Sequence, residues 1–275
     1  MKIGIVGLGL IGASYAARLK AEGHHIIGYD QASCVCDKAK ALEVVSECGL
    51  ERLAAADVLI LATYPKAAAS FIEHHQHRLS DTCLITDVCG VKVPLQQTIH
   101  SVLSHPQRYI SHHPMAGKAA HGLTHHDPRL FEGATCLMIQ EPMQNKEDYE
   151  TLIALLKILG FAKFIPLTAK EHDQAIGVVS QLTHAIAGTL MHLEETPKWA
   201  HTAGDSFADL TRIAALNAPM WTELFHENHV VLSDQLRRFA SELEHLAQAL
   251  ETDDQAKTFE YLDVASKIKK AIKER

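Results

Sequence analysis

The chain has 275 residues, of which 47% are hydrophobic and 21% are charged; this composition is ordinary for a soluble globular protein of one large domain or two ordinary ones. The formal net charge of −7 argues against a surface for nucleic acid or for an anionic membrane. No stretch approaches the roughly 20 apolar residues that a membrane span needs, and the glycine-broken apolar start of the chain is not typical of a signal peptide.

The first half of the chain alternates between short β-branched runs and helical patterns. The predicted strands are residues 2–6, 25–29, 57–63, 83–88, 108–111, 134–139 and 163–167. Helical patterns cover residues 10–22, which end near Gly23, and residues 66–78, which follow Pro65. Continuous apolar strands that alternate with helices predict a mostly parallel sheet covered on both faces.

From about Thr168 onward the pattern is helical, and no strand is expected. Thr168 and Glu171 form a capping box, which predicts the start of a long helix. This helix is expected to run to about Glu195 and to end at Thr196-Pro197.

A second apolar pattern occupies the last forty residues. Leucine and phenylalanine repeat every three or four positions and predict a buried helical stripe: Leu236, Phe239, Leu243, Leu246 and Leu250. Asp253 or Asp254 is expected to cap the last helix, whose apolar face includes Phe259, Leu262 and Ile268.

The predicted fold class is therefore α/β, with a Rossmann-type, mostly parallel sheet over residues 1–167 and an all-helical domain over residues 168–275. The helical part is short and strongly apolar. We expect it to complete its core against a second copy, which makes the protein a homodimer.

The six cysteines do not form a disulfide framework. Cys34 and Cys36 are too close for an ordinary bridge, and the others are scattered through apolar settings. We interpret all six as reduced thiols of a cytoplasmic protein.

Gly7, Gly9 and Gly12 form a G-x-G-x-x-G motif directly after the first predicted strand and at the start of a helix. The first glycine permits a tight turn, the second lets the backbone approach a pyrophosphate, and the third lets helix and strand pack closely. The free N–H groups of the helix N-terminus, around Leu10 and Ile11, then face the phosphates. The motif predicts a dinucleotide site, the alternative being a purely structural turn.

Asp30 ends the second predicted strand, about 20 residues beyond the glycines. A carboxylate there accepts hydrogen bonds from the ribose hydroxyls of NAD and repels the 2′-phosphate of NADP. Gln31, the next residue, brings no positive charge to offset that repulsion. We therefore expect NAD, with NADP less favoured; the alternative role for Asp30 is a strand-end cap.

Two further strand ends are expected to face the cofactor, because ligands bind outside the carboxyl ends of strands in such sheets. One is Thr63-Tyr64-Pro65, and the other runs from Asp87 to Gly90. The same logic brings His112 and His113, after the predicted strand 108–111, near the site.

Five segments resemble the prephenate/arogenate dehydrogenases of tyrosine biosynthesis, in that family's order and spacing. They are GIVGLGLIGAS (4–14), TDVCGVK (86–92), HPMAG (113–117), EHDQAIGVVSQLTH (171–184) and DLTRIAALNAPMW (209–221). The resemblance implies oxidative decarboxylation of prephenate or arogenate, with hydride transfer to NAD(P) and aromatisation of the ring. Such chemistry needs a neutral base, for which histidine is suited, and a cation for a carboxylate, for which arginine is suited.

The resemblance assigns roles to individual residues. His113 matches the catalytic histidine, and Pro114 favours an extended backbone at that residue. Arg212 matches the arginine that binds the substrate carboxylate, and Asp209 is expected to orient it. His112 matches no functional position and is interpreted as a loop residue.

Two aromatic residues are expected to border the substrate. His184 matches a histidine that lines the substrate site, and Trp221 lies where the family's pocket has its border. The alternatives are a satisfied helix histidine for His184, core packing for Trp221, and an inter-helix salt bridge for Arg212.

The sequence departs from the family at three positions. Gly90 replaces the serine of a D-x-x-S-x-K pattern, which leaves His113 without one partner. Ala208 replaces a basic residue, and Lys118 follows HPMAG where threonine is common. Lys118 is expected either to restore positive charge near an acidic substrate or to be solvated.

The sequence bears on three alternative functions. A β-hydroxyacid dehydrogenase needs a catalytic lysine on the helix that opens the second domain, and residues 171–197 contain none. An NAD-binding protein with weak or altered activity is favoured only by Gly90 and Ala208. A metal site among the histidines of residues 112–126 matches no ligand spacing, so no metal is expected. The choice between prephenate and arogenate stays open.

Overall fold

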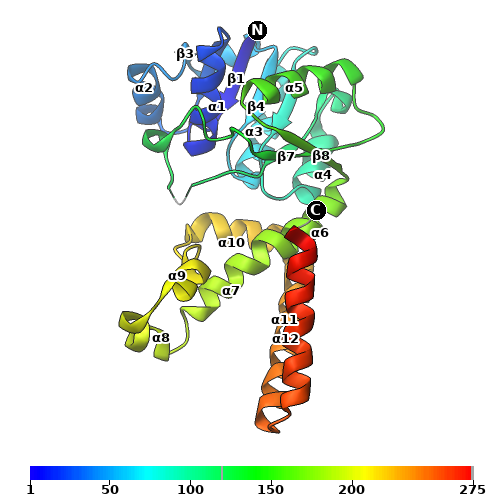
Figure 1. Cartoon of the computed structure of the whole chain (residues 1–275). Helices are drawn as coiled ribbons and strands as arrows, with labels where there is room; N and C mark the ends of the chain where they lie inside the picture. The colour runs from blue at the N-terminus through cyan, green and yellow to red at the C-terminus, as the bar shows by residue number, and fades with distance from the viewer. Residues whose placement is uncertain (119, 274–275) are drawn as a thin grey trace. The chain divides into compact units, whose positions relative to one another are not determined.

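The computed structural model describes residues 1–118 and 120–273 (Figure 1). It divides into two compact units, one from Met1 to Asn228 and one that begins at His229. The predicted domain boundary at residues 167 and 168 lies inside the first unit, and as a boundary it stays a prediction.

The first unit begins with a five-stranded parallel sheet in the order β3-β2-β1-β4-β5. Its strands are β1 (Lys2–Val6), β2 (His25–Tyr29), β3 (Glu47–Cys48), β4 (Val58–Leu61) and β5 (Leu84–Asp87). The helices between them are α1 (Leu10–Ala21), α2 (Ser33–Ala41), α3 (Pro65–His75) and, after β5, α4 (Val93–Val102). This strand order is that of a Rossmann-type sheet, with its topological switch between β1 and β4.

The register aligns the carboxyl ends of the strands at one edge. Val6 pairs with Tyr29 and with Leu61, and Leu61 pairs with Asp87. The glycine motif and the segments after β2, β4 and β5 therefore emerge side by side.

Alternate side chains of these strands fill two layers of core. Ile3, Ile5 and Ile60 belong to a buried cluster that includes α1 and α5 (Lys146–Ile158). Leu59 and Leu61 belong to a second cluster that includes α3 and α4. The period of two follows from strand geometry, and it explains the predicted helix cover on both faces.

A second, three-stranded sheet has the order β6-β7-β8. Its strands are β6 (His112–Pro114), β7 (Thr135–Ile139) and β8 (Lys163–Leu167); β6 is antiparallel to β7, and β7 is parallel to β8. The predicted strand 108–111 is wrong: a 3₁₀ turn covers Pro106–Arg108, and only Tyr109 makes an isolated bridge, to Ile85. The strand β6 instead starts at His112, one residue after the predicted strand would have ended, so His113 lies within it.

Further 3₁₀ turns connect these elements, at Leu50–Ala55, Gln76–Arg78, Leu123–His125 and Ala200–Thr202. The helix α2 and the two-residue strand β3 had no counterpart in the sequence prediction. Only one residue of α2, Ala39, is buried, so the apolar periodicity that reveals a helix is nearly absent there.

The helices of residues 168–228 are α6 (Ala169–Ile176), a π-helical segment (Gly177–Leu182), α7 (Thr183–Leu190), α8 (Glu195–Trp199), α9 (Asp205–Thr211) and α10 (Ala218–Glu227). The predicted capping box is confirmed, because Thr168 and Glu171 exchange side-chain-to-backbone hydrogen bonds. The predicted end of the long helix is wrong. The helical run stops at Leu190, and Pro197 lies in the first turn of α8, where a missing N–H breaks no helical hydrogen bond.

The second unit is a pair of helices, α11 (His229–Glu251) and α12 (Gln255–Lys273). Asp254 caps α12 by accepting a hydrogen bond from Lys257 N at 3.0 Å. The predicted burial of the stripe is wrong for Leu243 and Leu250, which are 51% and 61% exposed. A sequence period reveals which side chains share a helix face, but not whether one chain covers that face.

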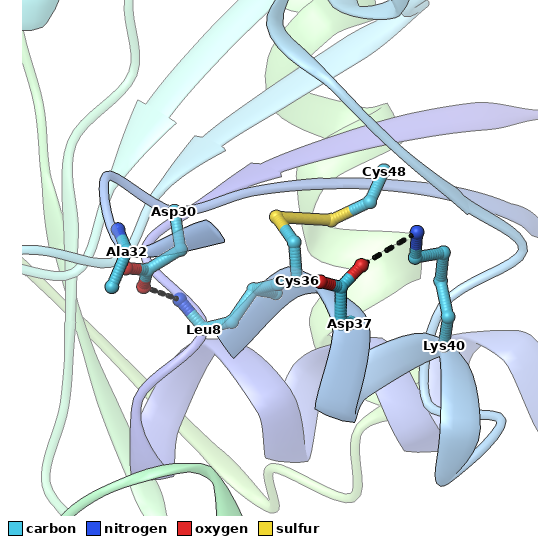
Figure 2. Close-up of a disulfide and its surroundings, with 7 residues drawn as sticks. All are labelled: Leu8, Asp30, Ala32, Cys36, Asp37, Lys40 and Cys48. Carbon is cyan, nitrogen blue, oxygen red and sulfur yellow. Dashed lines mark hydrogen bonds and ion pairs between the residues drawn. A yellow bond between two sulfur atoms is a disulfide. The ribbon is translucent and has the colours of Figure 1, made fainter. Parts of the chain in front are cut away.

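The cysteine prediction is wrong for one pair. Cys36 on α2 and Cys48 on β3 form a disulfide, with Cα atoms 5.9 Å apart (Figure 2). The spacing considered in the sequence, Cys34 with Cys36, was not the relevant one, because the turn after α2 brings β3 back beside it. Cys34, Cys83, Cys89 and Cys136 are free.

Among residues 1–118 and 120–273, no helix combines the length and the apolar character that a membrane crossing requires.

Candidate active site

The glycine motif forms the turn between β1 and α1. Gly7 has a φ of +90°, and a Cβ there would lie 2.5 Å from the carbonyl oxygen of Ala62, so other residues are excluded. A Cβ on Gly12 would lie 1.9 Å from the carbonyl oxygen of Gly7. A Cβ on Gly9, in contrast, would meet no described atom within 4 Å.

This contrast tests whether the turn fits a dinucleotide. Gly7 and Gly12 are required by the protein's own packing, whereas Gly9 leaves one side of the backbone open. The first N–H groups of α1, which include those of Leu10 and Ile11, have no partner four residues earlier in the helix. The open side and these donors fit a pyrophosphate group.

Asp30 follows β2 and lies against the same turn. Its two carboxylate oxygens accept hydrogen bonds from Leu8 N and Ala32 N, both at 3.0 Å (Figure 2). The predicted alternative, a strand-end cap, is thus part of what Asp30 does. A carboxylate has about four acceptor positions, so these two bonds leave capacity for ribose hydroxyls.

The segment after β4 starts a helix. Pro65 is the first residue of α3, Tyr64 is its N-cap, and the carbonyl oxygen of Thr63 accepts from Cys89 Sγ at 3.3 Å. At the same helix end, Lys66 N donates to Glu223 on α10 at 2.8 Å. The helices after residue 168 therefore reach the cofactor edge of the sheet.

Asp87 ends β5 as predicted, but its side chain faces inward. The carboxylate is fully buried and accepts from Lys92 Nζ at 2.7 Å, from Tyr109 Oη at 2.6 Å and from Cys89 N at 2.9 Å. Burial is the largest single influence and opposes ionisation, but the charge of Lys92 and the hydrogen bonds from Lys92, Ser111 and Tyr109 together lower the pKa of Asp87. Any effect of this carboxylate on the cofactor is therefore indirect.

Lys92 supports the next strand as well. Its Nζ also donates to the carbonyl oxygen of His112 at 2.6 Å, and its side chain is fully buried. The buried Asp87–Lys92 pair thus joins β5 to β6 at His112.

His112 is not the loop residue that the sequence suggested. It is a fully buried member of β6, and its ring nitrogens are hydrogen-bonded to Tyr15 Oη at 3.0 Å and Thr86 Oγ1 at 2.7 Å. Burial, together with the charge of Lys92, lowers its pKa to about 3. His112 is therefore a neutral structural residue.

His113 points the other way, because successive side chains of a strand alternate. It is half-buried, and a Cβ built on Gly90 would lie 3.9 Å from its Cε1. Gly90 also lies beside Leu224 of α10. The two residues that the sequence brought to one site, His113 and Gly90, are thus neighbours.

The Nδ1 atom of His113 has a partner that sequence reasoning missed. It lies 2.8 Å from Nε2 of His172, whose Nδ1 lies 2.8 Å from an oxygen of Asp173. Burial lowers the pKa of His113 well below 6.5, and the nearby His172, Lys92 and His112 act in the same direction. His113 is therefore neutral at physiological pH, as a base must be.

The signal for this pair was present in the sequence. Residues 171–173 read EHD within the segment EHDQAIGVVSQLTH, but only Glu171 received a role, in the capping box, and His172 and Asp173 received none. Histidine and aspartate next to each other on a helix have no motif of their own. Only the packing of α6 against β6 and α4 reveals their connection.

A second cluster contains His184 and Trp221. Their rings stack with centroids 4.0 Å apart, and His184 Nδ1 lies 2.8 Å from the carbonyl oxygen of Ser180. Trp221 is one turn before Leu224 on α10, so this helix connects the cluster to Gly90 and His113.

Arg212 follows α9 and is exposed. Burial is the main cause of a lowered pKa at His184, and the charge of Arg212 contributes to it, so the two side chains are near each other. Within the described residues, neither Arg212 nor Asp209 has an ion-pair partner. The guanidinium of Arg212 is thus available to a carboxylate.

Lys118, another predicted site residue, forms an ion pair away from His113. Its Nζ lies 2.6 Å from Asp127 Oδ2, and Asp127 N donates to Ser14 Oγ of α1 at 2.9 Å. The structure therefore connects Lys118, through Asp127, to α1 rather than to His113 and His172. A group of three or more histidine, cysteine or carboxylate ligands for a metal is absent from the described part of the chain.

Comparison with known proteins gives a consistent result. The model for the nucleotide-binding domain of prephenate dehydrogenase matches residues 15–165, and that for its dimerization domain matches residues 168–264. The chain is 32% identical to the prephenate dehydrogenase of Lactococcus lactis subsp. cremoris (strain MG1363) over 98% of this chain and 77% of that protein.

Two solved structures are similar over nearly their whole length. The crystal structure of Synechocystis arogenate dehydrogenase has a TM-score of 0.84 and 27% identity, and it covers 99% of this chain and 100% of its own. The prephenate dehydrogenase from A. aeolicus, solved in complex with hydroxyphenyl propionate and NAD+, has a TM-score of 0.87 and 24% identity, with 99% and 98% covered. The predicted fold class, a Rossmann-type domain followed by helices, is confirmed.

Proposed function

This chain belongs to the prephenate dehydrogenase family, and from that premise we propose that it catalyses the NAD-dependent oxidative decarboxylation of prephenate or arogenate, with His113 as the base. The observation that carries the proposal is the environment of His113. Its Nδ1 is engaged by His172, while the side of its ring that includes Cε1 faces Gly90 at the carboxyl edge of the sheet.

The proton balance defines what His113 must do. When bound, the nicotinamide supplies the hydride acceptor. As the carbon that bears the ring hydroxyl is oxidised, the hydroxyl proton passes to Nε2 of His113. The ring carboxylate then departs as CO₂ and leaves its electron pair in the ring, which becomes aromatic. The phenol oxygen of the product regains the proton, so His113 returns what it took.

The substrate is held by the second cluster. Arg212 carries an unpaired positive charge for a carboxylate, and arginine binds carboxylates through two parallel hydrogen bonds. His184 and Trp221 stack beside it and form one wall of the site. Asp209, three residues before Arg212 on the neighbouring helix turn, orients the guanidinium when substrate arrives.

The cofactor is NAD rather than NADP. A nicotinamide cofactor is typical of this family, and the choice depends on Asp30. Its carboxylate lies at the end of β2, beside the open face of the glycine turn, where a 2′-phosphate would be repelled.

The protein acts as a homodimer in the cytoplasm. The exposed apolar side chains of α11 and α12 support dimerisation: Val230, Leu243, Leu250, Phe259, Leu262, Val264, Ile268 and Ile272. A groove of about 480 Å³ also lies between these two helices. Exposed apolar surface of this extent is typical of an interface. Light scattering of the purified chain is expected to give twice the mass of 30.3 kDa.

One assay tests the activity. Formation of NADH or NADPH is followed at saturating NAD or NADP, respectively, with prephenate and with arogenate, side by side. The proposal expects turnover with NAD and at least one of the two substrates. No turnover with either substrate, together with tight NAD binding, would favour the alternative of a cofactor-binding protein without this activity, to which Gly90 and Ala208 point.

A further inference from the structure

We propose that His172 and Asp173 are positioning residues that form a proton relay with His113, in which His172 takes the Nδ1 proton of His113 when His113 accepts the substrate proton. The inference rests on the proposed function, since it assumes that His113 is the base. It assigns a role to two buried polar residues that take no part in the proton transfer between substrate and His113.

The hydrogen bonds fix the direction of the relay. The Asp173 carboxylate has no proton to donate, so Nδ1 of His172 carries the hydrogen of their 2.8 Å bond. A neutral His172 therefore presents a bare Nε2, which accepts from Nδ1–H of His113 across 2.8 Å. In that tautomer Nε2 of His113 is bare as well, which is the form that takes a proton from a hydroxyl.

Asp173 is held as a charged anchor. One of its oxygens accepts from Lys92 N at 2.8 Å and the other from Val93 N at 2.9 Å, at the N-terminus of α4. The positive end of a helix stabilises a carboxylate at this place. Asn228 Nδ2 also donates to the backbone oxygen of Asp173 at 2.9 Å. The residue is thus fixed on both sides, and its charge faces His172.

The surrounding charges explain why a relay is needed. An imidazolium at His113 faces burial, the ammonium of Lys92 and two other histidines, His112 and His172, all of which lower its pKa. Burial and the charge of Lys92 also lower the pKa of His172, but its hydrogen bond to the Asp173 carboxylate and the charges of Asp173 and Asp87 oppose these effects. A proton on His172 is therefore next to a negative charge, and a proton on His113 is not.

The relay balances without any other reactant. The O–H bond of the substrate breaks and its proton binds Nε2 of His113. The Nδ1–H bond of His113 breaks and that proton binds Nε2 of His172, which becomes an imidazolium paired with Asp173. When the phenol oxygen of the product regains its proton, both transfers reverse.

Gly90 supports the inference independently. A Cβ at this position would lie 3.9 Å from His113 Cε1, so a serine there would add a hydroxyl next to the imidazole. The chain lacks that hydroxyl. The bond from His172 is then the only side-chain hydrogen bond that the described residues give to His113, and it alone sets the tautomer.

The simpler explanation is that His172 and Asp173 only join α6 to α4. The replacement His172→Gln separates the two explanations, because glutamine keeps a polar side chain of similar reach but cannot take a proton. The relay predicts that kcat falls roughly 10- to 100-fold, by analogy with the loss of the partners that orient metal-ligating histidines, while the Kd for NAD is unchanged. It also predicts that the acid limb of the kcat/KM profile moves to lower pH, because the His113–His172 pair loses the position beside Asp173 where the added proton resides.

Asn228→Ala is the matched control. It removes a bond to the backbone of Asp173 and loosens the same packing, but it leaves the three relay side chains intact. The relay predicts a lower melting temperature and an unmoved acid limb. If His172→Gln shows only a lower melting temperature, with its acid limb in the wild-type position, the relay is wrong.

Two further measurements keep the outcome decisive. If His172→Gln does not fold, a solvent proton inventory on the unmodified enzyme replaces it. The relay moves two protons, so it predicts that kcat/KM depends on the deuterium fraction of the solvent along a curve. A straight-line dependence overturns the relay. The variant His113→Asn separates the relay from the proposed function. Full activity in His113→Asn refutes the base itself, whereas an inactive His113→Asn with a wild-type-like His172→Gln refutes the relay alone.

Discussion

Replacing Gly90 with serine is expected to raise the activity of this enzyme. The position follows β5 and lies beside His113, and its φ is not in the left-handed region that favours glycine. A Cβ would meet methyl groups of Leu224 at 3.4 and 3.7 Å and His113 Cε1 at 3.9 Å. These are ordinary van der Waals distances, so the backbone accepts a side chain here.

The magnitude follows from one hydrogen bond. A serine hydroxyl, one bond beyond the Cβ, comes within reach of the His113 ring and of a substrate hydroxyl held against it. A net hydrogen bond contributes about 1 kcal/mol, which corresponds to roughly fivefold in kcat/KM if it forms only in the transition state. Gly90→Ala is the matched control, because it adds the same Cβ without the hydroxyl. The stability of both variants is expected to rise slightly, by about 0.4–1 kcal/mol, through the lost freedom of the unfolded chain.

The assay is kcat/KM for the active substrate at saturating NAD, with melting temperatures measured in parallel. The expected result is a kcat/KM several-fold higher for Gly90→Ser than for Gly90→Ala, at similar melting temperatures. Equal activities of the serine and alanine variants would refute the reasoning. They would mean that His172 already satisfies the need for a partner of His113.

Three other predictions concern the remaining parts of the site. Arg212→Ala is expected to raise KM for the acid substrate at least about 10-fold, the effect of losing a charged hydrogen bond, with kcat nearly unchanged; a normal KM would move the carboxylate site elsewhere. Asp30→Ser is expected to reduce the preference for NAD, because the charge that repels a 2′-phosphate is gone; an unaltered ratio of kcat/KM for NAD and NADP would contradict the role of Asp30. Burial lowers the pKa of His113 well below 6.5, and the base acts in its neutral form, so kcat/KM is expected to stay constant from pH 6.5 to 8 and to fall only as pH drops below that range; a limb centred above pH 6.5 would contradict a buried neutral base.

The fold was predictable where patterns are strong. The five parallel strands except the two-residue β3 were found from apolar runs, and Thr168 with Glu171 was found from capping chemistry. The errors have physical causes. Residues 108–111 contain only two residues that favour a strand, Tyr109 and Ile110, and the turn that starts at Pro106 leaves ladder pairing to begin at His112.

The site was predictable in its parts but not in its connections. The glycine motif and His113 were identified from their order along the chain. The bond between His113 and His172 joins residues 59 positions apart, and no local pattern encodes it. Asp87 is a second example. Its place at a strand end predicted a contact with the cofactor, but its side chain pairs with Lys92 in the interior.

The central claim is that His113 is the base, and His113→Asn tests it most directly. The measurement is kcat for the active substrate together with the Kd for NAD by fluorescence titration. The account predicts that kcat falls by about 10²-fold or more, the usual contribution of a positioned base, while the Kd for NAD stays within twofold of the wild-type value, about 0.4 kcal/mol. A kcat close to that of the unmodified enzyme would contradict it.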